Sequence, residues 1–144
     1  INDGAAAVTL MSEEEVNKRA AKKLVSIKSW ASCGVDPALM GTGPIPSSKK
    51  ALELAGWSIK DIDLFEINEA FAAQSLAVIQ ELGLDRTRVN LDGGAIALGH
   101  PLGASGARIT GKAANLLQTN DGRLALATMC AAGGQGIATI LEKF

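Results

Sequence analysis

Short apolar runs alternate along the chain with longer segments of helical character. Apolar and polar residues partly alternate in Lys23–Trp30 and in Ile62–Ile67, which is typical of strands. Two further apolar runs, Leu124–Met129 and Ile137–Leu141, flank a glycine-rich turn and lie close enough in the sequence to pair as a hairpin. Ala5–Met11 also has the composition of a strand.

Helices are predicted between these runs. Ser12 can accept a backbone hydrogen bond at the start of a short helix, and the acidic residues Glu13–Glu15 suit the positive end of its dipole. The other expected helices are Ser47–Ala55 and Ala70–Leu82, with Gly56 and Gly83 as stop signals, and one from Pro101 to about Thr119. Strands that alternate with helices predict an α/β fold, in which a layered mixed β-sheet is covered by helices.

Composition narrows the class of protein. A chain of 144 residues is about one domain and can bury a core, and its net charge of −1 offers no basic face to nucleic acid. No apolar run is long enough to span a membrane, and no signal peptide is visible. Cys33 and Cys130 are too few for a disulfide framework and are not spaced like zinc ligands, which favours a reducing, cytoplasmic location without a metal.

The beginning of the chain suggests a longer polypeptide. Ile1–Gly4 contains no initiating methionine and leads directly into the strand-like segment. Because a domain rarely opens on a structural motif without a lead-in, we expect this chain to be the back part of a larger protein.

The only histidine, His100, lies between Gly99 and Pro101 in a glycine-framed loop that runs into a predicted helix. A single histidine is often a hydrogen-bonded structural residue, and the sequence alone leaves that role and a catalytic role equally open. At a helix entrance the dipole disfavours the imidazolium, which would keep the ring neutral and able to accept a proton.

The two cysteines are in different settings. Cys130 ends an apolar run directly before Ala131–Gly136, a turn whose backbone N–H groups can point at an anion and favour a thiolate. The alternative is a small buried apolar residue. Cys33 lies at a strand end without a charged neighbour in the sequence and is interpreted as a buried structural thiol. We therefore expect Cys130 to be the more accessible of the two.

Two other motifs that could belong to a functional site can also be explained by helix structure alone. Asn68 and Glu69 lie where a strand meets a helix, and Asn68 is suited to capping that helix. Gly106–Ala113 is similar to a phosphate-binding P-loop, but it lacks the hydroxyl that would bind Mg²⁺ and falls inside a predicted helix. Nucleotide hydrolysis is therefore not expected.

Five blocks of this sequence, taken together, resemble the C-terminal half of thiolases, the acyl-CoA:acetyl-CoA C-acyltransferases. In the family's order they are Asn2–Ala7, Met40–Pro44, Asn68–Phe71, Gly99–Arg108 and Cys130–Gly136, so the resemblance covers essentially the whole chain. It implies a thiolase-fold C-terminal domain over residues 21–144, preceded in residues 1–20 by the end of the thiolase N-terminal domain.

The resemblance also implies roles for individual residues. Thiolases run a reversible Claisen condensation through an acyl-cysteine, and their nucleophile lies in the N-terminal half, which this chain does not contain. His100 would activate that nucleophile and then donate a hydrogen bond to the enolate oxygen. Asn68 would hold a catalytic water, with Glu69 supporting the site. Cys130 would remove the α-proton of acetyl-CoA or return it.

The remaining implied positions concern the oxyanion and the substrate. Backbone N–H groups near Ala132 and Gly133 would bind the oxyanion of the acyl-cysteine. Many thiolases have glycine where this chain has Ala132, and alanine would be strained if the turn requires a positive φ. Met40, Ala70 and Phe71 match positions that line the acyl and pantetheine channel, although core packing would explain them equally well.

The expected function is acetyl-CoA C-acetyltransferase activity in the full-length protein, with coenzyme A thioesters as substrates and no cofactor. The N-terminal half would lie in the same polypeptide, which is expected to form a homodimer or homotetramer. A 3-ketoacyl-CoA thiolase of β-oxidation is the first alternative. A cysteine hydrolase and a catalytically inert acyl-CoA-binding or assembly module are the others. The isolated chain should be inactive because it lacks the nucleophile.

Overall fold

The structure is a computed structural model that describes residues 1–144. Four strands, five α-helices and three short 3₁₀ helices follow one another along the chain. In order they are α1 (Glu13–Arg19), β1 (Val25–Gly34), η1 (Pro37–Thr42), α2 (Pro44–Ala55), η2 (Ile59–Asp61), β2 (Leu64–Ile67), α3 (Ala72–Leu82), η3 (Arg86–Arg88), α4 (Ala95–Leu98), α5 (Ser105–Thr119), β3 (Leu124–Ala131) and β4 (Gln135–Lys143).

The four strands form one mixed sheet in the order β1-β4-β3-β2. β3 and β4 are the predicted antiparallel hairpin, and β1 pairs antiparallel with β4. β2 pairs parallel with β3, because the chain between them crosses over through α3, α4 and α5. The predicted layered mixed sheet covered by helices is confirmed.

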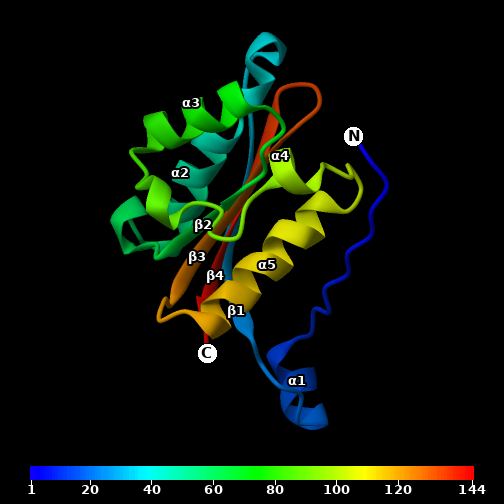
Figure 1. The fold of residues 1–144 in the computed structure, drawn as a ribbon. Coiled ribbons are helices and arrows are strands. Elements are labelled where there is room, and N and C mark those ends of the chain that lie inside the picture. The colour runs from blue at the N-terminus through cyan, green and yellow to red at the C-terminus, as the bar shows by residue number, and fades with distance from the viewer.

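Helices cover both faces of this sheet, with α2 and α3 on one side and α5 on the other (Figure 1). The larger core lies on the first side, where apolar residues of α2 and α3 pack on the strands. The smaller core lies under α5, where Ala113 and Leu117 pack on Leu64 of β2 and Ala125 of β3. Alternation along each strand therefore sends neighbouring side chains into different cores.

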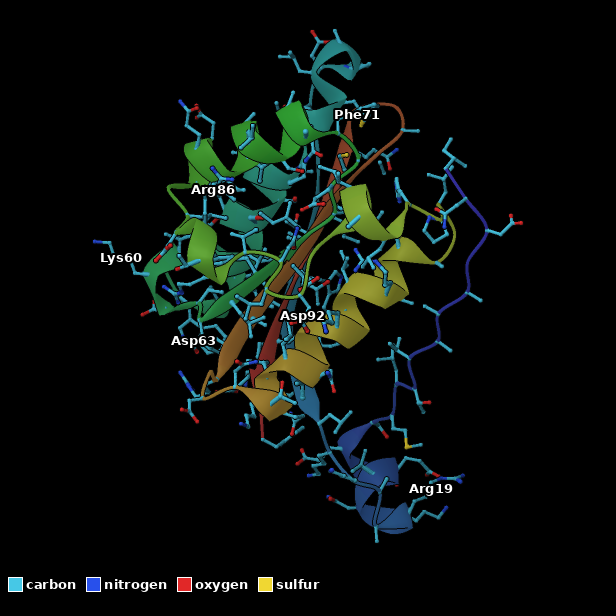
Figure 2. The ribbon with its side chains drawn as sticks, viewed as in Figure 1. Arg19, Lys60, Asp63, Phe71, Arg86 and Asp92 are labelled. Carbon is cyan, nitrogen blue, oxygen red and sulfur yellow. The ribbon has the colours of Figure 1, made fainter.

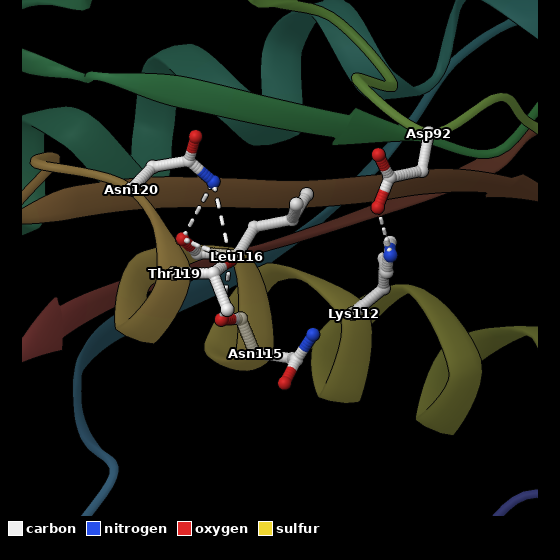
Figure 3. A network of polar contacts seen from close by, with 6 residues as sticks. All are labelled: Asp92, Lys112, Asn115, Leu116, Thr119 and Asn120. Atoms are coloured by element: carbon white, nitrogen blue, oxygen red, sulfur yellow. Dashed lines mark hydrogen bonds and ion pairs between the residues drawn. The ribbon is translucent and has the colours of Figure 1, made fainter.

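α5 is the longest helix of the protein. Ile109, Ala113, Leu116 and Leu117 are buried along it at helical spacing, which gives it one apolar face. Its last turn is closed by Asn120, whose side-chain amide donates to the Leu116 carbonyl at 3.0 Å (Figure 3). No helix in the protein is long and apolar enough to cross a bilayer.

The predicted helix ends are confirmed where capping residues specify them. The Ser12 hydroxyl accepts from the Glu15 amide at 3.2 Å, which caps α1. Gly56 and Gly83 end α2 and α3 in the left-handed conformation that glycine adopts without strain.

Three expectations are wrong in detail, and one short helix was not expected. Ala5–Met11 is not a strand, because it runs beside α5, away from any strand with which it could pair (Figure 1). α2 starts at Pro44, where proline is tolerated in a first turn, and not at Ser47. The last long helix begins at Ser105 and not at Pro101, and the short helix Ala95–Leu98 was missed.

Two glycines allow α2 to approach the hairpin closely. A Cβ on Gly136 would lie 2.0 Å from the Gly43 carbonyl carbon, and a Cβ on Gly43 would lie 2.5 Å from the Gln135 carbonyl oxygen. Gly136 is also the residue paired with Cys130 in the hairpin. The backbone entering α2 is thus packed against the backbone opposite Cys130.

Candidate active site

The predicted site residues gather at one edge of the sheet. β2 and β3 are parallel, so the segments that follow them leave the sheet at the same edge. The Asn68 amide donates to the Thr128 carbonyl at 3.0 Å, and Cys130 lies two residues further along β3. Phe71 extends from this edge at the start of α3 (Figure 2). Strand direction alone therefore brings two distant motifs together.

His100 is held between two side chains. Its Nε2 lies 3.3 Å from the Asn68 amide nitrogen, and its Nδ1 lies 2.7 Å from the Ser105 Oγ. The Ser105 hydroxyl donates its single hydrogen to the Pro101 carbonyl at 3.1 Å, so it accepts from His100. This assigns the hydrogen of the neutral ring to Nδ1 and leaves Nε2 to accept from Asn68. The sequence-predicted pair Asn68 and His100 is therefore in direct contact.

The electrostatic environment of His100 keeps its ring neutral. Burial lowers the pKa of His100, and the positive charge of Arg108 lowers it further. The predicted direction is confirmed, but its cause is different, since α5 begins five residues later at Ser105. Burial and the nearby Arg108 cation take the place of the helix dipole that the sequence suggested.

Asn68 does not cap a helix. α3 begins at Ala72 with Phe71 as its N-cap residue, so the capping interpretation is wrong. The Asn68 side chain is fully buried and points to His100, while its Oδ1 has no hydrogen-bond partner. The amide therefore orients the ring through its nitrogen and retains an acceptor, consistent with a polar role at the site.

Glu69 supports the loop that carries His100. Its carboxylate accepts from the Asn90 side chain at 2.9 Å and from the Ile96 amide at 3.0 Å. It also packs on Gly94, where any Cβ would lie within 2.3 Å of the carboxyl carbon. These contacts fix the start of α4, immediately before Gly99 and His100. Glu69 was expected to support the site, and its contacts with Asn90, Ile96 and Gly94 are the means by which it can do so.

Two residues of this region were missed by sequence reasoning. Ser105 is fully buried and contacts His100, and its only sequence signal is its place in the Gly-Ala-Ser-Gly block after the histidine. Asn90, with a φ of 48°, exchanges two hydrogen bonds with the backbone of Ile67 and so extends the edge of β2. A left-handed asparagine has no sequence signal of its own beyond its tolerance of that conformation.

The two cysteines contradict the expected order of accessibility. Cys130 is buried with 4% of its surface exposed, whereas Cys33 is half-buried. Burial raises the pKa of the Cys130 thiol, and a hydrogen bond from its own backbone N–H offsets this only in part. The resting form of Cys130 is therefore the thiol, and the expectation of a favoured, accessible thiolate is wrong. The Sγ of Cys130 has no hydrogen bond to His100 or Asn68.

The turn after β3 accommodates alanine without strain. Its positive φ angles fall on Gly133 and Gly134, at 80° and 86°, and Ala132 has none. A Cβ on Gly134 would lie 2.3 Å from the Val35 carbonyl oxygen, so glycine is required there for space as well. The concern raised by Ala132 is thereby removed, and its N–H and that of Gly133 lie in the exposed part of the turn.

The predicted channel residues surround the same edge of the sheet. Met40 lies half-buried in η1, whose Gly41 packs on the Gln74 side chain near the start of α3. Ala70 is half-buried in the segment between β2 and α3, and Phe71 is 64% exposed. Core packing therefore does not explain Phe71, which remains available to contact an apolar ligand.

These groups are suited to proton transfer next to a developing negative charge. A neutral imidazole, a thiol and backbone N–H groups lie at the same edge of the sheet. Together they are the groups that general acid–base catalysis on a carbonyl compound requires. No cluster of three or more His, Cys, Asp or Glu side chains is arranged to hold a metal ion.

Comparison with known protein families gives a match over most of the chain. Residues 21–143 match the family model described as the C-terminal domain of thiolase. The curated relatives include acetyl-CoA acetyltransferases of Escherichia coli (strain K12) and Paracoccus denitrificans, which are 57% and 54% identical to it over 143 residues. A mouse relative, 53% identical, is named as the cytosolic acetyl-CoA acetyltransferase. Each alignment covers 99% of this chain but only 36–37% of the relative.

Solved structures show the same architecture. The acetyl-CoA acetyltransferase of Bacillus anthracis superposes with a TM-score of 0.91 and 46% identity over 93% of this chain and 34% of that one. Human mitochondrial 3-ketoacyl-CoA thiolase superposes with a TM-score of 0.91 and 48% identity over 92% of this chain and 34% of that one. The chain thus spans about a third of the length of the proteins that it resembles.

Proposed function

Since the chain belongs to the thiolase family, as its C-terminal domain, we propose that its parent enzyme condenses two acetyl-CoA molecules reversibly to acetoacetyl-CoA and CoA. The observation that carries the proposal is the contact of His100 with Asn68 and Ser105 at one edge of the sheet. Cys130 lies near the end of β3 at the same edge. Relatives more than 50% identical over the whole chain are named for this activity.

His100 acts twice in the proposed reaction. In its neutral form it accepts the proton of the nucleophilic thiol, which then attacks the thioester carbonyl and releases CoA with that proton. In the second half-reaction the neutral ring carries its hydrogen on Nε2 instead, while the Ser105 hydroxyl turns to donate to Nδ1. The ring can then donate a hydrogen bond to the enolate oxygen of the bound acetyl-CoA, and a water held by Asn68 is the second donor. Ser105 holds the ring in position for both steps.

Cys130 moves the α-proton. In condensation its thiolate takes a proton from the methyl group of acetyl-CoA, and the enolate carbon attacks the acyl-cysteine and expels the nucleophilic thiolate. In thiolysis the Cys130 thiol returns a proton to the enolate carbon. Because burial raises the pKa of Cys130, its resting thiol is already the form that thiolysis requires.

The channel residues suit the thioester tail. Phe71 presents an exposed ring beside the edge that carries the proposed acid–base groups, and Met40 lies in the neighbouring η1. Apolar side chains in this position would pack on pantetheine while the reacting carbonyl enters the polar edge.

A longer-chain thiolase is the second candidate, because the human mitochondrial 3-ketoacyl-CoA thiolase superposes as well as the acetyltransferase does. We further propose that the parent enzyme is a homo-oligomer. We also propose that it works in the cytosol, since the mouse relative is named as the cytosolic enzyme.

Thiolysis by the full-length enzyme tests the proposed function. We expect cleavage of acetoacetyl-CoA by CoA, with kcat/KM higher than for a 3-ketoacyl-CoA of sixteen carbons, and no turnover by the 144-residue chain. The fall in absorbance of the Mg²⁺-enolate of acetoacetyl-CoA and the formation of acyl-CoA products measured by chromatography are the readouts. A higher kcat/KM for the long substrate would favour the second candidate, and absence of cleavage of either would refute both.

Ser105→Ala should weaken catalysis without removing a catalytic group. The change leaves the His100 Nδ1–H without its acceptor, and a neutral hydrogen bond is worth about 1 kcal/mol, so kcat/KM should fall about fivefold. Ser48→Ala is the matched control, because Ser48 is equally buried but its hydroxyl has no partner. Steady-state kinetics and the urea midpoint separate the two: equal losses of kcat/KM in both variants would contradict the positioning role of Ser105.

A further inference from the structure

A buried carboxyl group lies behind the His100 site and takes no part in the mechanism above. Glu66 is fully buried in β2, and neither of its carboxylate oxygens has a hydrogen-bond partner. It lies two residues from Leu64, which packs under α5, and two residues from Asn68, which contacts His100. By strand alternation all three side chains face α5.

The guanidinium group of Arg108, on α5, is also buried in part without hydrogen-bond partners. Two nitrogens of Arg108, Nε and Nη2, are buried without a partner. Arg108 lies three residues after Ser105, hence about one turn from the residue that holds His100. Buried polar atoms are nearly always paired, so unpaired acceptors on β2 facing unpaired donors on α5 require an explanation.

The register of α5 on β2 places these groups opposite each other. Ala113 and Leu117 of α5 pack at Leu64, whereas Ser105 and His100 meet Asn68 at the other end of the strand. The helix therefore runs antiparallel to β2, and its middle residues, including Arg108, lie over Glu66.

The charges around Glu66 agree with this placement. Burial raises the pKa of Glu66 to about 7, and among the neighbouring charges Arg108 opposes this most, followed by Lys112. Asp92 and Glu69 act in the opposite direction. Lys112 already pairs with Asp92 at the surface (Figure 3), which leaves Arg108 as the cation without an acidic partner.

The positive charge of Arg108 also acts on His100, since it contributes to the lowered pKa of the ring. A carboxylate that pairs with Arg108 would screen its charge from the imidazole and fix the first turns of α5 on β2.

We propose that Glu66 and Arg108 pair through an ordered water and act as positioning residues that hold the Asn68–His100–Ser105 chain and set the charge that His100 experiences. The inference rests on the proposed function for its catalytic meaning, but the pairing itself concerns only the buried face between β2 and α5. Neither residue touches the reacting atoms.

Titration of His100 in the full-length enzyme tests this pairing. Histidine labelled with ¹³C gives ring resonances whose pH dependence NMR follows, and the His100→Asn variant identifies the signal. Arg108→Met should raise the pKa of His100, because it removes a positive charge. Glu66→Gln should lower it, because pairing with Arg108 keeps Glu66 ionised below about pH 7, and loss of that carboxylate leaves the charge of Arg108 unscreened. In the double variant the effect of Glu66→Gln should disappear, since the charge that it screens is gone.

Catalysis and a conservative variant supply the second readout. Arg108→Met should lower kcat about tenfold with little change in KM, because misplaced catalytic groups affect the reaction more than binding. Arg108→Lys keeps the charge and should retain the titration of His100, even if Arg108→Met fails to fold. The matched control combines Lys112→Met, on the same helix as Arg108, with Asp92→Asn in its ion-pair partner, and should leave both the pKa of His100 and kcat unchanged.

The outcomes are distinct. If Glu66→Gln shifts the pKa of His100 by the same amount with and without Arg108, the pairing is overturned. The same holds if the pKa of His100 in Arg108→Met equals that in the Lys112→Met, Asp92→Asn control. An enzyme that lacks thiolase activity while His100 titrates as described would refute the proposed function and leave the pairing intact.

Discussion

Replacing His100 with alanine in the full-length enzyme is expected to lower kcat/KM for acetoacetyl-CoA thiolysis by about 10²–10⁴-fold, the usual contribution of a general acid–base group. Both half-reactions should suffer, because the ring activates the nucleophile and stabilises the enolate. Rapid-quench measurement of acyl-enzyme formation and isotope exchange into acetyl-CoA measure the two steps separately.

The pH profile of the unchanged enzyme provides the matching test for His100. Its lowered pKa means that the neutral ring persists below about pH 6.5, the ordinary value for histidine. The rate of acylation should therefore hold through pH 6.5 and fall only at lower pH, as the ring gains a proton. A midpoint above pH 6.5, absent from the His100→Ala profile, would contradict the neutral ring, and acylation at the native rate in that variant would contradict the assigned role.

Replacing Cys130 with serine should abolish proton transfer while leaving acylation almost intact. A serine hydroxyl is far too weak an acid to form the base at neutral pH, so exchange of the methyl protons of acetyl-CoA into D₂O should fall by about 10²–10⁴-fold. Acyl-enzyme formation, which needs the nucleophile and His100, should stay within a few-fold of the original. NMR of the exchanged methyl group and mass spectrometry of the acyl-enzyme give the two rates.

Cys33→Ser is the matched control for Cys130→Ser, because Cys33 belongs to β1 and has no assigned role. The raised pKa of Cys130 adds a directional test: only the thiolate abstracts the proton, so the exchange rate should increase with pH across the neutral range. Equal loss of acylation and exchange in Cys130→Ser, or an exchange rate that falls with rising pH, would contradict the division of roles.

Sequence reasoning succeeded where the signal is local. Ser12, Gly56 and Gly83 end or begin helices through contacts within a few residues, so their positions could be predicted from the chain alone. The hairpin of β3 and β4 is local in the same sense. The strand predicted at Ala5–Met11 failed because a strand exists only beside another strand, and composition does not reveal the neighbour.

Site residues could be named from the sequence, but their contacts could not. His100 and Asn68 were candidates by their motifs, yet the hydrogen bond between them spans 32 residues and depends on the parallel pairing of β2 with β3. Ser105 was missed because a serine near a helix start is ordinary until its hydroxyl is seen at the imidazole.

The sequence by itself determined the α/β class, the C-terminal ends of α2, α3 and α5, the hairpin and the motif residues, because periodicity, capping and glycine turns act over a few residues. Only the tertiary structure decided the order of the strands, the ring hydrogen of His100 and the protonation of Cys130. It also decided that the Glu66 carboxylate and two nitrogens of Arg108 are buried without hydrogen-bond partners. These properties depend on burial and on charges brought together from distant segments, and no stretch of the chain carries that information alone.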